Sequence, residues 1–144
     1  MSEVTAYMIL RKAIRQPRDR IDRIENLVGT GFPDTNCCLA GVEVWIELKA
    51  PKEPKRKTTK LFGSNHKLSQ AQKNWLLSQE QAGGRAFVYI ETDKRRLLIG
   101  GRHGDEINEL CVQDLMDISE WMSSRTRTTQ QEWDRLRQIL RGEL

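Results

Sequence analysis

The chain has 144 residues, 38% hydrophobic and 31% charged, and its 24 Lys and Arg against 20 Asp and Glu give a net charge of +4. This length suits a single domain, residues 1–144, whose core needs no disulfide or metal for stability. The modest basic excess is compatible with nucleic acid as a partner without requiring it. No apolar stretch approaches the length of a membrane span and residues 1–10 lack a secretory signal, so we expect a soluble cytoplasmic protein with no membrane partner.

The cysteine pattern argues against a zinc site. The chain has three cysteines, Cys37, Cys38 and Cys111, and two histidines, His66 and His103. No pair of cysteines has the C-x-x-C spacing of zinc ligands, and their number is odd. We therefore expect reduced and mostly buried thiols, as in an intracellular protein.

The first thirty residues predict a helix and then a less certain segment. Apolar residues at helical spacing predict a helix over residues 3–15, with Ser2 as its N-cap and Pro17 beyond its end. Residues 18–28 fit a strand and a helix equally well. The glycines and the proline of residues 29–33 predict a turn.

Two strands follow, over residues 34–39 and 42–49, joined by a tight turn at Ala40-Gly41. Side chains alternate across a strand, so the second strand has one face for the core and another that carries charge. Its core face consists of Val42, Val44, Ile46 and Leu48, and its other face of Glu43, Trp45, Glu47 and Lys49.

The second half continues with a basic loop over residues 50–66, which we expect to be mobile because it has little apolar content. A helix over residues 68–81 ends at Gly83-Gly84, and strands follow over residues 86–91 and 97–100. Only helices are expected beyond. The first of these contains Leu115, Ile118, Trp121 and Met122, and the last contains Trp133, Leu136 and Leu140. The order predicts an α/β fold with a mixed sheet, made of a core over residues 1–104 and a helical extension over 105–144.

One constellation of charged residues predicts chemistry. If residues 34–39 and 42–49 pair as a hairpin, Asp34 comes close to Glu47, with Lys49 beside it at a sheet edge. Mg²⁺ prefers oxygen ligands and keeps several waters, so one or two carboxylates suffice to hold it. The lysine could orient an attacking water or stabilise a charged phosphate.

These residues also resemble a known family. Pro33-Asp34, twelve intervening residues and Glu47-Leu48-Lys49 are similar to the signature of the PD-(D/E)XK nuclease superfamily. The flanking motifs narrow the resemblance to the VRR-NUC branch, which includes small stand-alone phage nucleases and relatives of Holliday-junction resolvases. Those motifs are Arg23-Ile24-Glu25-Asn26, Gly31-Phe32-Pro33-Asp34, residues 68–76 and residues 83–90.

The resemblance covers roughly residues 20–100 and implies a restriction-endonuclease-like core of helix, three-stranded meander, helix and strand, with residues 22–26 as its first strand. It implies an endonuclease that hydrolyses phosphodiester bonds in branched or duplex DNA with Mg²⁺ or Mn²⁺. It further implies a phage-encoded protein in the host cytoplasm. A symmetric homodimer would give such an enzyme two active sites for two strands.

The resemblance also assigns roles to individual residues. Asp34 and Glu47 would bind the metal together with the carbonyl of Leu48, and Lys49 would orient water or stabilise charge. Gln72 would face the active site. Ser69-x-x-Gln72 is also a capping box, however, and one amide is not expected to fill both roles at once.

The family usually has one further acid, for which the chain offers two candidates. We prefer Glu25, because its neighbours match the phage pattern, over Glu3 on the first helix.

The basic loop directly follows the proposed catalytic strand. Its position favours a clamp for DNA phosphates, while a solvated linker is the alternative reading of a run of charge. The proposed nucleic-acid contacts are Lys52, Lys55, Arg56, Lys57, Lys60, His66 and Lys67.

Two other functions fit the same sequence. A nuclease-like scaffold can serve as a non-catalytic DNA-binding module, because fold does not guarantee chemistry. Alternatively, the C-terminal helices with Trp121 and Trp133 could form the interface of a regulatory protein–protein module.

Overall fold

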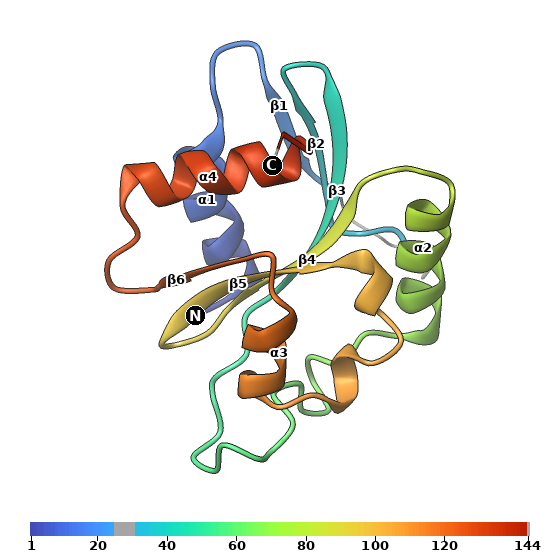
Figure 1. Ribbon diagram of the computed structural model, residues 1–144, viewed down its shortest axis with the longest axis vertical. Helices are drawn as coiled ribbons and strands as arrows, with labels where there is room; N and C mark the ends of the chain where they lie inside the picture. Colours follow the sequence, from blue (N-terminus) through green and yellow to red (C-terminus); the bar gives the residue numbers. More distant parts are fainter. Residues whose placement is uncertain (25–30, 144) are drawn as a thin grey trace.

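A computed structural model describes residues 1–24 and 31–143. The described chain forms one six-stranded sheet in the order β1-β2-β3-β4-β5-β6 (Figure 1). The strands are β1 (Arg20–Arg23), β2 (Thr35–Leu39), β3 (Val42–Lys49), β4 (Ala86–Glu91), β5 (Arg95–Gly100) and β6 (Trp121–Ser124). The helices are α1 (Glu3–Ile14), α2 (Gln70–Gln81), α3 (Val112–Ile118) and α4 (Gln130–Leu140), with short 3-10 turns η1 (Gly101–His103) and η2 (Ile107–Glu109). No described helix is long and apolar enough to cross a membrane.

Helices cover both faces of the sheet (Figure 1). On one face, α1 and α4 pack their apolar residues against Ile46 and Leu48 of β3, and against Tyr89 and Leu98. On the other face, α2 and α3 pack against Val88, Ile90, Leu97 and Ile99. We call the apolar cluster on the side of α1 and α4 the first core, and the cluster on the side of α2 and α3 the second core. The apolar face predicted for residues 42–49 lies in the first core, while Glu47 and Lys49 lie on the side of α2.

β3 is a central strand because it pairs with β2 on one side and with β4 on the other. β1, β2 and β3 pair antiparallel, and the β2–β3 turn uses positive φ angles at Ala40 (48°) and Gly41 (90°), as a tight hairpin requires. β4 returns through α2 and pairs with β3 in parallel. Glu47 and Lys49 thus lie in the interior of the sheet, so the expected position at a sheet edge is wrong.

Most predicted elements are confirmed, with one correction in the C-terminal part. Trp121 and Met122 belong to β6 rather than to a helix, because the chain is already extended at Ser119 and then pairs with β5. Trp121 is 5% exposed and Met122 is 51% exposed, which is the alternation of a strand. Trp121 and Met122 follow Ile118 by three and four positions, which is also the spacing of an apolar stripe on a helix.

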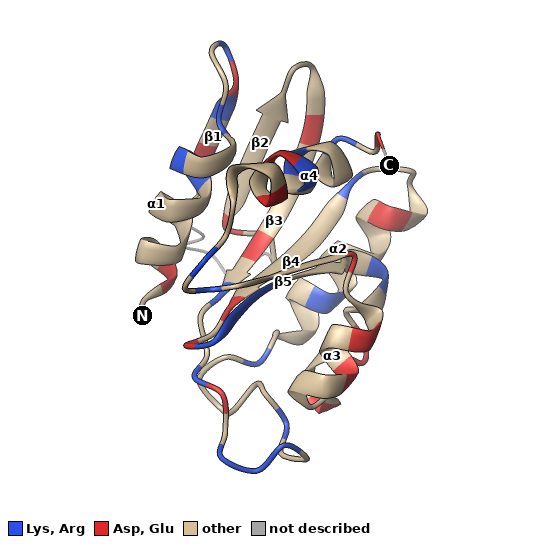
Figure 2. Cartoon of the chain, turned by 60° about the vertical axis from the view of Figure 1, so that its left-hand side comes forward, with Lys and Arg blue, Asp and Glu red and all other residues tan. Residues whose placement is uncertain are grey.

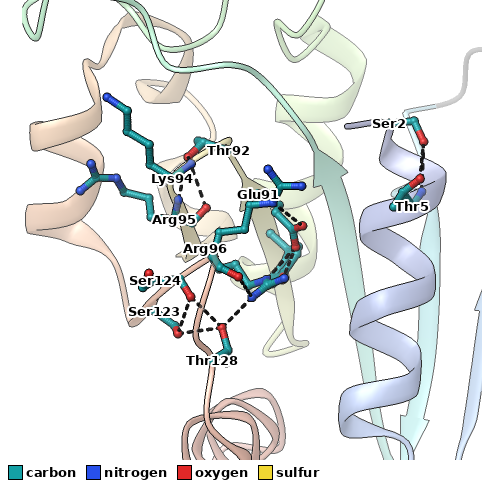
Figure 3. A network of polar contacts seen from close by, with 12 residues as sticks. Ser2, Thr5, Glu91, Thr92, Lys94, Arg95, Arg96, Ser123, Ser124 and Thr128 are labelled. Carbon is teal, nitrogen blue, oxygen red and sulfur yellow. Dashed lines mark hydrogen bonds and ion pairs between the residues drawn. The ribbon is translucent and has the colours of Figure 1, made fainter.

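The C-terminal part is tied to the sheet by polar contacts. Arg96 of β5 bonds Glu91 of β4 at 2.8 Å and the Thr128 hydroxyl before α4 at 2.7 Å (Figure 3). The Arg137 guanidinium of α4 forms a buried ion pair with Asp19, next to β1. Residues 105–143 therefore complete the sheet with β6 and add one helix to each of its faces, α3 on one and α4 on the other.

The cysteines lie as strand alternation requires, with Cys37 buried and Cys38 exposed on β2. Burial raises the pKa of the Cys37 thiol to about 12, which keeps it protonated and unreactive. Cys111 is partly exposed, so the expectation of mostly buried thiols holds only for Cys37.

Candidate active site

Asp34, Glu47 and Lys49 lie together, as the predicted hairpin requires. Thr35 pairs with Ile46, so Asp34 stands across from Glu47. The Asp34 N–H donates to Glu47 Oε1 at 3.3 Å, and the Leu48 N–H donates to Asp34 Oδ1 at 3.0 Å. Lys49 Nζ is 3.6 Å from Glu47 Oε2. Glu47 and Lys49 are only 4% and 6% exposed, on the face of the sheet where α2 packs and where Gln72 contacts Glu47.

Burial and proximity give the two carboxyls unusual acidities. Burial, and then the charge of Asp34, raises the pKa of Glu47 to about 8, although Lys49 opposes the rise. Burial also raises the pKa of Asp34 to about 6, against the hydrogen bond from Leu48 and the charge of Arg23. Two adjacent carboxyls that resist ionising together are typical of a site that receives a cation or shares a proton.

Gln72 fills both of the roles that the sequence set in competition, so the expectation that one amide cannot do so is wrong. Its side-chain Oε1 accepts the Ser69 backbone N–H at 2.9 Å, and its backbone N–H donates to Ser69 Oγ, which completes the capping box of α2. Its Nε2 donates to Glu47 Oε2 at 3.2 Å. The start of α2 therefore orients the carboxylate of β3.

Gly31 fixes the approach to Asp34. Its φ is +81°, and a Cβ built there would lie 2.4 Å from the Ala71 carbonyl oxygen of α2. Only glycine permits both this backbone conformation and this contact. The segment that leads to Asp34 is thus held against the same helical turn that carries Gln72.

Of the two candidates for a further acid, Glu25 lies outside the described residues. Glu3 begins α1, and its charge contributes to the raised pKa of both Asp34 and Glu47, after the larger effect of burial. Sequence reasoning gave no role to Arg23, which opposes that shift at Asp34 and lies 5.9 Å from the centre of the Tyr7 ring. Only its position inside the quoted motif could have drawn attention to it.

The basic loop presents much of its charge to solvent but is anchored at its ends (Figure 2). Leu61 and Phe62 are buried in the second core, and Glu53 pairs with Arg95 at 2.7 Å. Lys60 is occupied by an ion pair with Glu109. Lys60 is itself exposed, and the exposed cations outside that ion pair are Lys52, Lys55, Arg56, Lys57 and Lys67.

His66 belongs to a cleft whose lining includes neither Asp34 nor Glu47. With Lys52, Glu91 and Arg125 it lines this cleft of about 280 Å³ beyond the end of β3. Its position at the rim of the basic loop is compatible with the proposed phosphate contact.

The donor set fits a hard divalent cation. The described hydrogen bonds to the Asp34 carboxylate, from the Leu48 N–H and the Thr35 hydroxyl, both reach Oδ1. From the described residues, no hydrogen bond reaches Oδ2, the oxygen that would take a cation. Within residues 1–24 and 31–143, no three His, Cys, Asp or Glu side chains gather as a metal site. Two carboxylates are nevertheless enough for an ion that keeps most of its water shell.

Comparison with known proteins shows the fold. Neither a protein-family model nor a curated protein sequence matches the chain. Among solved structures, the chain is similar to that of Archaeoglobus fulgidus Hjc, a Holliday junction resolvase from an archaeal hyperthermophile. The TM-score is 0.53 at 16% identity, over 81% of this chain and 89% of the resolvase chain. The chain therefore has the restriction-endonuclease-like fold that the sequence predicted.

Proposed function

We propose that the protein is a metal-dependent nuclease that hydrolyses phosphodiester bonds in DNA. The observation that carries this proposal is the pair of the partly buried Asp34 and the buried Glu47, whose carboxylates accept hydrogen bonds from the backbone N–H groups of Leu48 and Asp34, with Lys49 beside Glu47. The likeness of the fold to a Holliday junction resolvase supports the same chemistry.

Each residue of the candidate active site would have its own role in such a reaction. Asp34 and Glu47 would hold the metal, with the Leu48 carbonyl as a further ligand, and Gln72 keeps Glu47 in place through Oε2. A bound Mg²⁺ or Mn²⁺ supplies an acidified water and neutralises charge on the phosphate. Lys49 places its ammonium beside the carboxylates, where it stabilises negative charge that develops on the phosphate.

The finer assignment extends this proposal. The order of motifs supports a VRR-NUC-like enzyme of phage type, and the resolvase likeness supports branched DNA as the substrate. A homodimer would place two such sites on the two strands of a junction. The exposed cations of the basic loop would bind the phosphates on either side of the cut.

The test is cleavage of labelled four-way junction, flap, duplex and single-stranded DNA with Mg²⁺, Mn²⁺ or chelator. We expect metal-dependent cutting that falls by at least a hundredfold in Glu47→Gln and in Lys49→Met. Glu43→Gln is the matched control, because Glu43 lies on the same face of β3 but is exposed. Equal activity of Glu47→Gln and Glu43→Gln would refute the site.

The same experiment distinguishes a nuclease from a non-catalytic DNA-binding module. A non-catalytic DNA-binding module would bind these substrates through the exposed loop without cutting them under any metal. In that case the binding would depend on the basic loop and not on Glu47.

A further inference from the structure

Three aromatic side chains form a cluster next to the candidate active site. The rings of Trp45 and Trp75 are 5.1 Å apart, and the ring of Phe32 lies 6.0 Å from the first and 5.6 Å from the second. The planes are inclined by 31° to 60°, the tilted geometry that aromatic rings prefer. We call Phe32, Trp45 and Trp75 the aromatic platform.

Each of the three aromatic residues is two or three sequence positions from a residue of the candidate active site. Phe32 is two positions before Asp34, and Trp45 is two positions before Glu47 on the same face of β3. Trp75 follows Gln72 by three positions, which is about one turn of α2. Two residues of a strand span about 6–7 Å, so the platform begins within one nucleotide's reach of the carboxylates.

The exposure of the platform differs from that of the other tryptophan pair. Trp121 and Trp133 are also in contact, at 5.7 Å, but they are only 5% and 8% exposed. Phe32 is 43% exposed, and Trp45 and Trp75 are partly exposed while their inner parts pack on the second core. Core packing therefore accounts for one side of the platform and leaves an aromatic surface facing solvent beside the site.

We propose that the aromatic platform stacks an unpaired nucleobase of the DNA strand whose phosphate lies at Asp34 and Glu47. This inference rests on the proposed nuclease function. Bases in a duplex stack on one another inside the helix, so a platform on the protein reaches a base only where the strand is single or unpaired. Aromatic side chains hold such bases without regard to sequence, because every base has a π-face. The substrate class is therefore DNA with an unpaired nucleotide next to the cut, such as a flap, a gap or the centre of a branched junction.

The test measures binding in a Glu47→Gln background, which holds DNA without cutting it. Affinities for a labelled single-stranded oligonucleotide and for the matching duplex are compared after Trp75→Leu and after Phe32→Leu. We expect each change to weaken single-strand binding about tenfold to a hundredfold and duplex binding less than twofold. Met122→Ala, which removes an exposed apolar side chain from the distant strand β6, should change neither.

A second arm identifies the stacked base. Abasic sites are placed one at a time along the oligonucleotide, and tryptophan fluorescence is recorded. One abasic position should reproduce the loss of affinity and the loss of quenching, and Trp75→Leu should add little to it. Thermal unfolding of each variant shows whether the fold is retained, and Phe32→Leu, at the most exposed ring, carries the test if Trp75→Leu does not fold.

The outcomes also separate this inference from the proposed function. Metal-dependent cleavage together with unchanged single-strand affinity in both ring variants would leave the nuclease standing and overturn the platform. Equal weakening of single-strand and duplex binding would overturn it as well. If sedimentation shows a dimer that Trp75→Leu dissociates, the surface belongs to a second copy of the chain and the inference fails.

Discussion

The amide of Gln72 joins the start of α2 to the carboxylate of Glu47 through a hydrogen bond of 3.2 Å, while it also caps its own helix. Helix and site therefore share one side chain, and the two functions can be separated by substitution. Ser69→Ala removes only the cap, and we expect it to lower the free energy of unfolding by about 1 kcal/mol while cleavage is retained.

Gln72→Glu is the complementary change. It keeps an oxygen for the Ser69 N–H but replaces the donor to Glu47 with a negative charge. We expect cleavage to fall at least tenfold with little loss of helix stability. Urea unfolding and cleavage rates of both variants test the separation, and parallel losses in both measurements would contradict it.

The raised pKa values of Asp34 and Glu47 predict how stability depends on pH. Folding raises these pKa values from 3.8 and 4.5 to about 6 and about 8. The stability that the protonated pair contributes is therefore complete below pH 3.8 and is lost as the pH rises through about 6 and about 8. We expect the metal-free protein to become less stable over this window, and Mg²⁺ to restore stability at its alkaline end.

Asp34→Asn tests the origin of this loss. The amide oxygen still accepts the Leu48 N–H, but no second negative charge forms beside Glu47. We expect a higher unfolding temperature than wild type at pH 8 in chelator, and little difference at pH 4. Asp22→Asn, at an exposed acid paired with Arg20, should show neither effect. Loss of stability at pH 8 in Asp34→Asn would argue against repulsion between the carboxyls.

Gly31→Ala tests how the segment before Asp34 is positioned. The new Cβ would lie 2.4 Å from the Ala71 carbonyl oxygen, and the alanine would have to adopt an unfavourable positive φ. We expect the free energy of unfolding to fall by roughly 2–4 kcal/mol and cleavage to fall with it, since Asp34 moves away from Glu47. Gly83→Ala separates the two causes, because its φ is +86° but its Cβ has open space. Its expected cost is about 1 kcal/mol, with cleavage unchanged.

Periodicity and turn residues predicted much of this fold and site. The bounds of β3, the hairpin that brings Asp34 to Glu47 and the cap of α2 follow from local patterns. Two features depend on contacts distant in sequence and left no local trace. Trp121 enters a strand because β5 offers it a hydrogen-bonding edge. Glu47 and Lys49 are buried on the face of the sheet where α2 packs, whereas a strand that alternates apolar and charged residues predicts a solvent-exposed charged face.

The same limit applies to the interpretation of individual side chains. The sequence presents Gln72 as a choice between cap and site, because spacing cannot show that its two amide atoms contact different partners. Sequence spacing likewise cannot show that Trp45 and Trp75 meet with their rings partly exposed, near Asp34 and Glu47.

The exposed cations of the basic loop predict a salt-dependent affinity for DNA. Lys55, Arg56 and Lys57 are exposed on the loop that follows β3. Each phosphate that they neutralise releases counterions, so changing all three to Gln should reduce the slope of log affinity against log salt by about 3. Binding should weaken equally for all DNA sequences, and titrations between low and moderate salt measure the slope.

A matched triple variant removes the same charge elsewhere. Lys12, Arg15 and Arg18 are exposed at and just beyond the end of α1, so changing them to Gln alters the net charge by the same amount without touching the loop. If net charge alone attracted DNA, both triple variants would lose affinity equally. A larger loss and a shallower slope for the loop variant alone would place the phosphates on the loop, next to Lys49 and the candidate active site. Equal slopes for the two variants would assign the loop the role of a solvated linker.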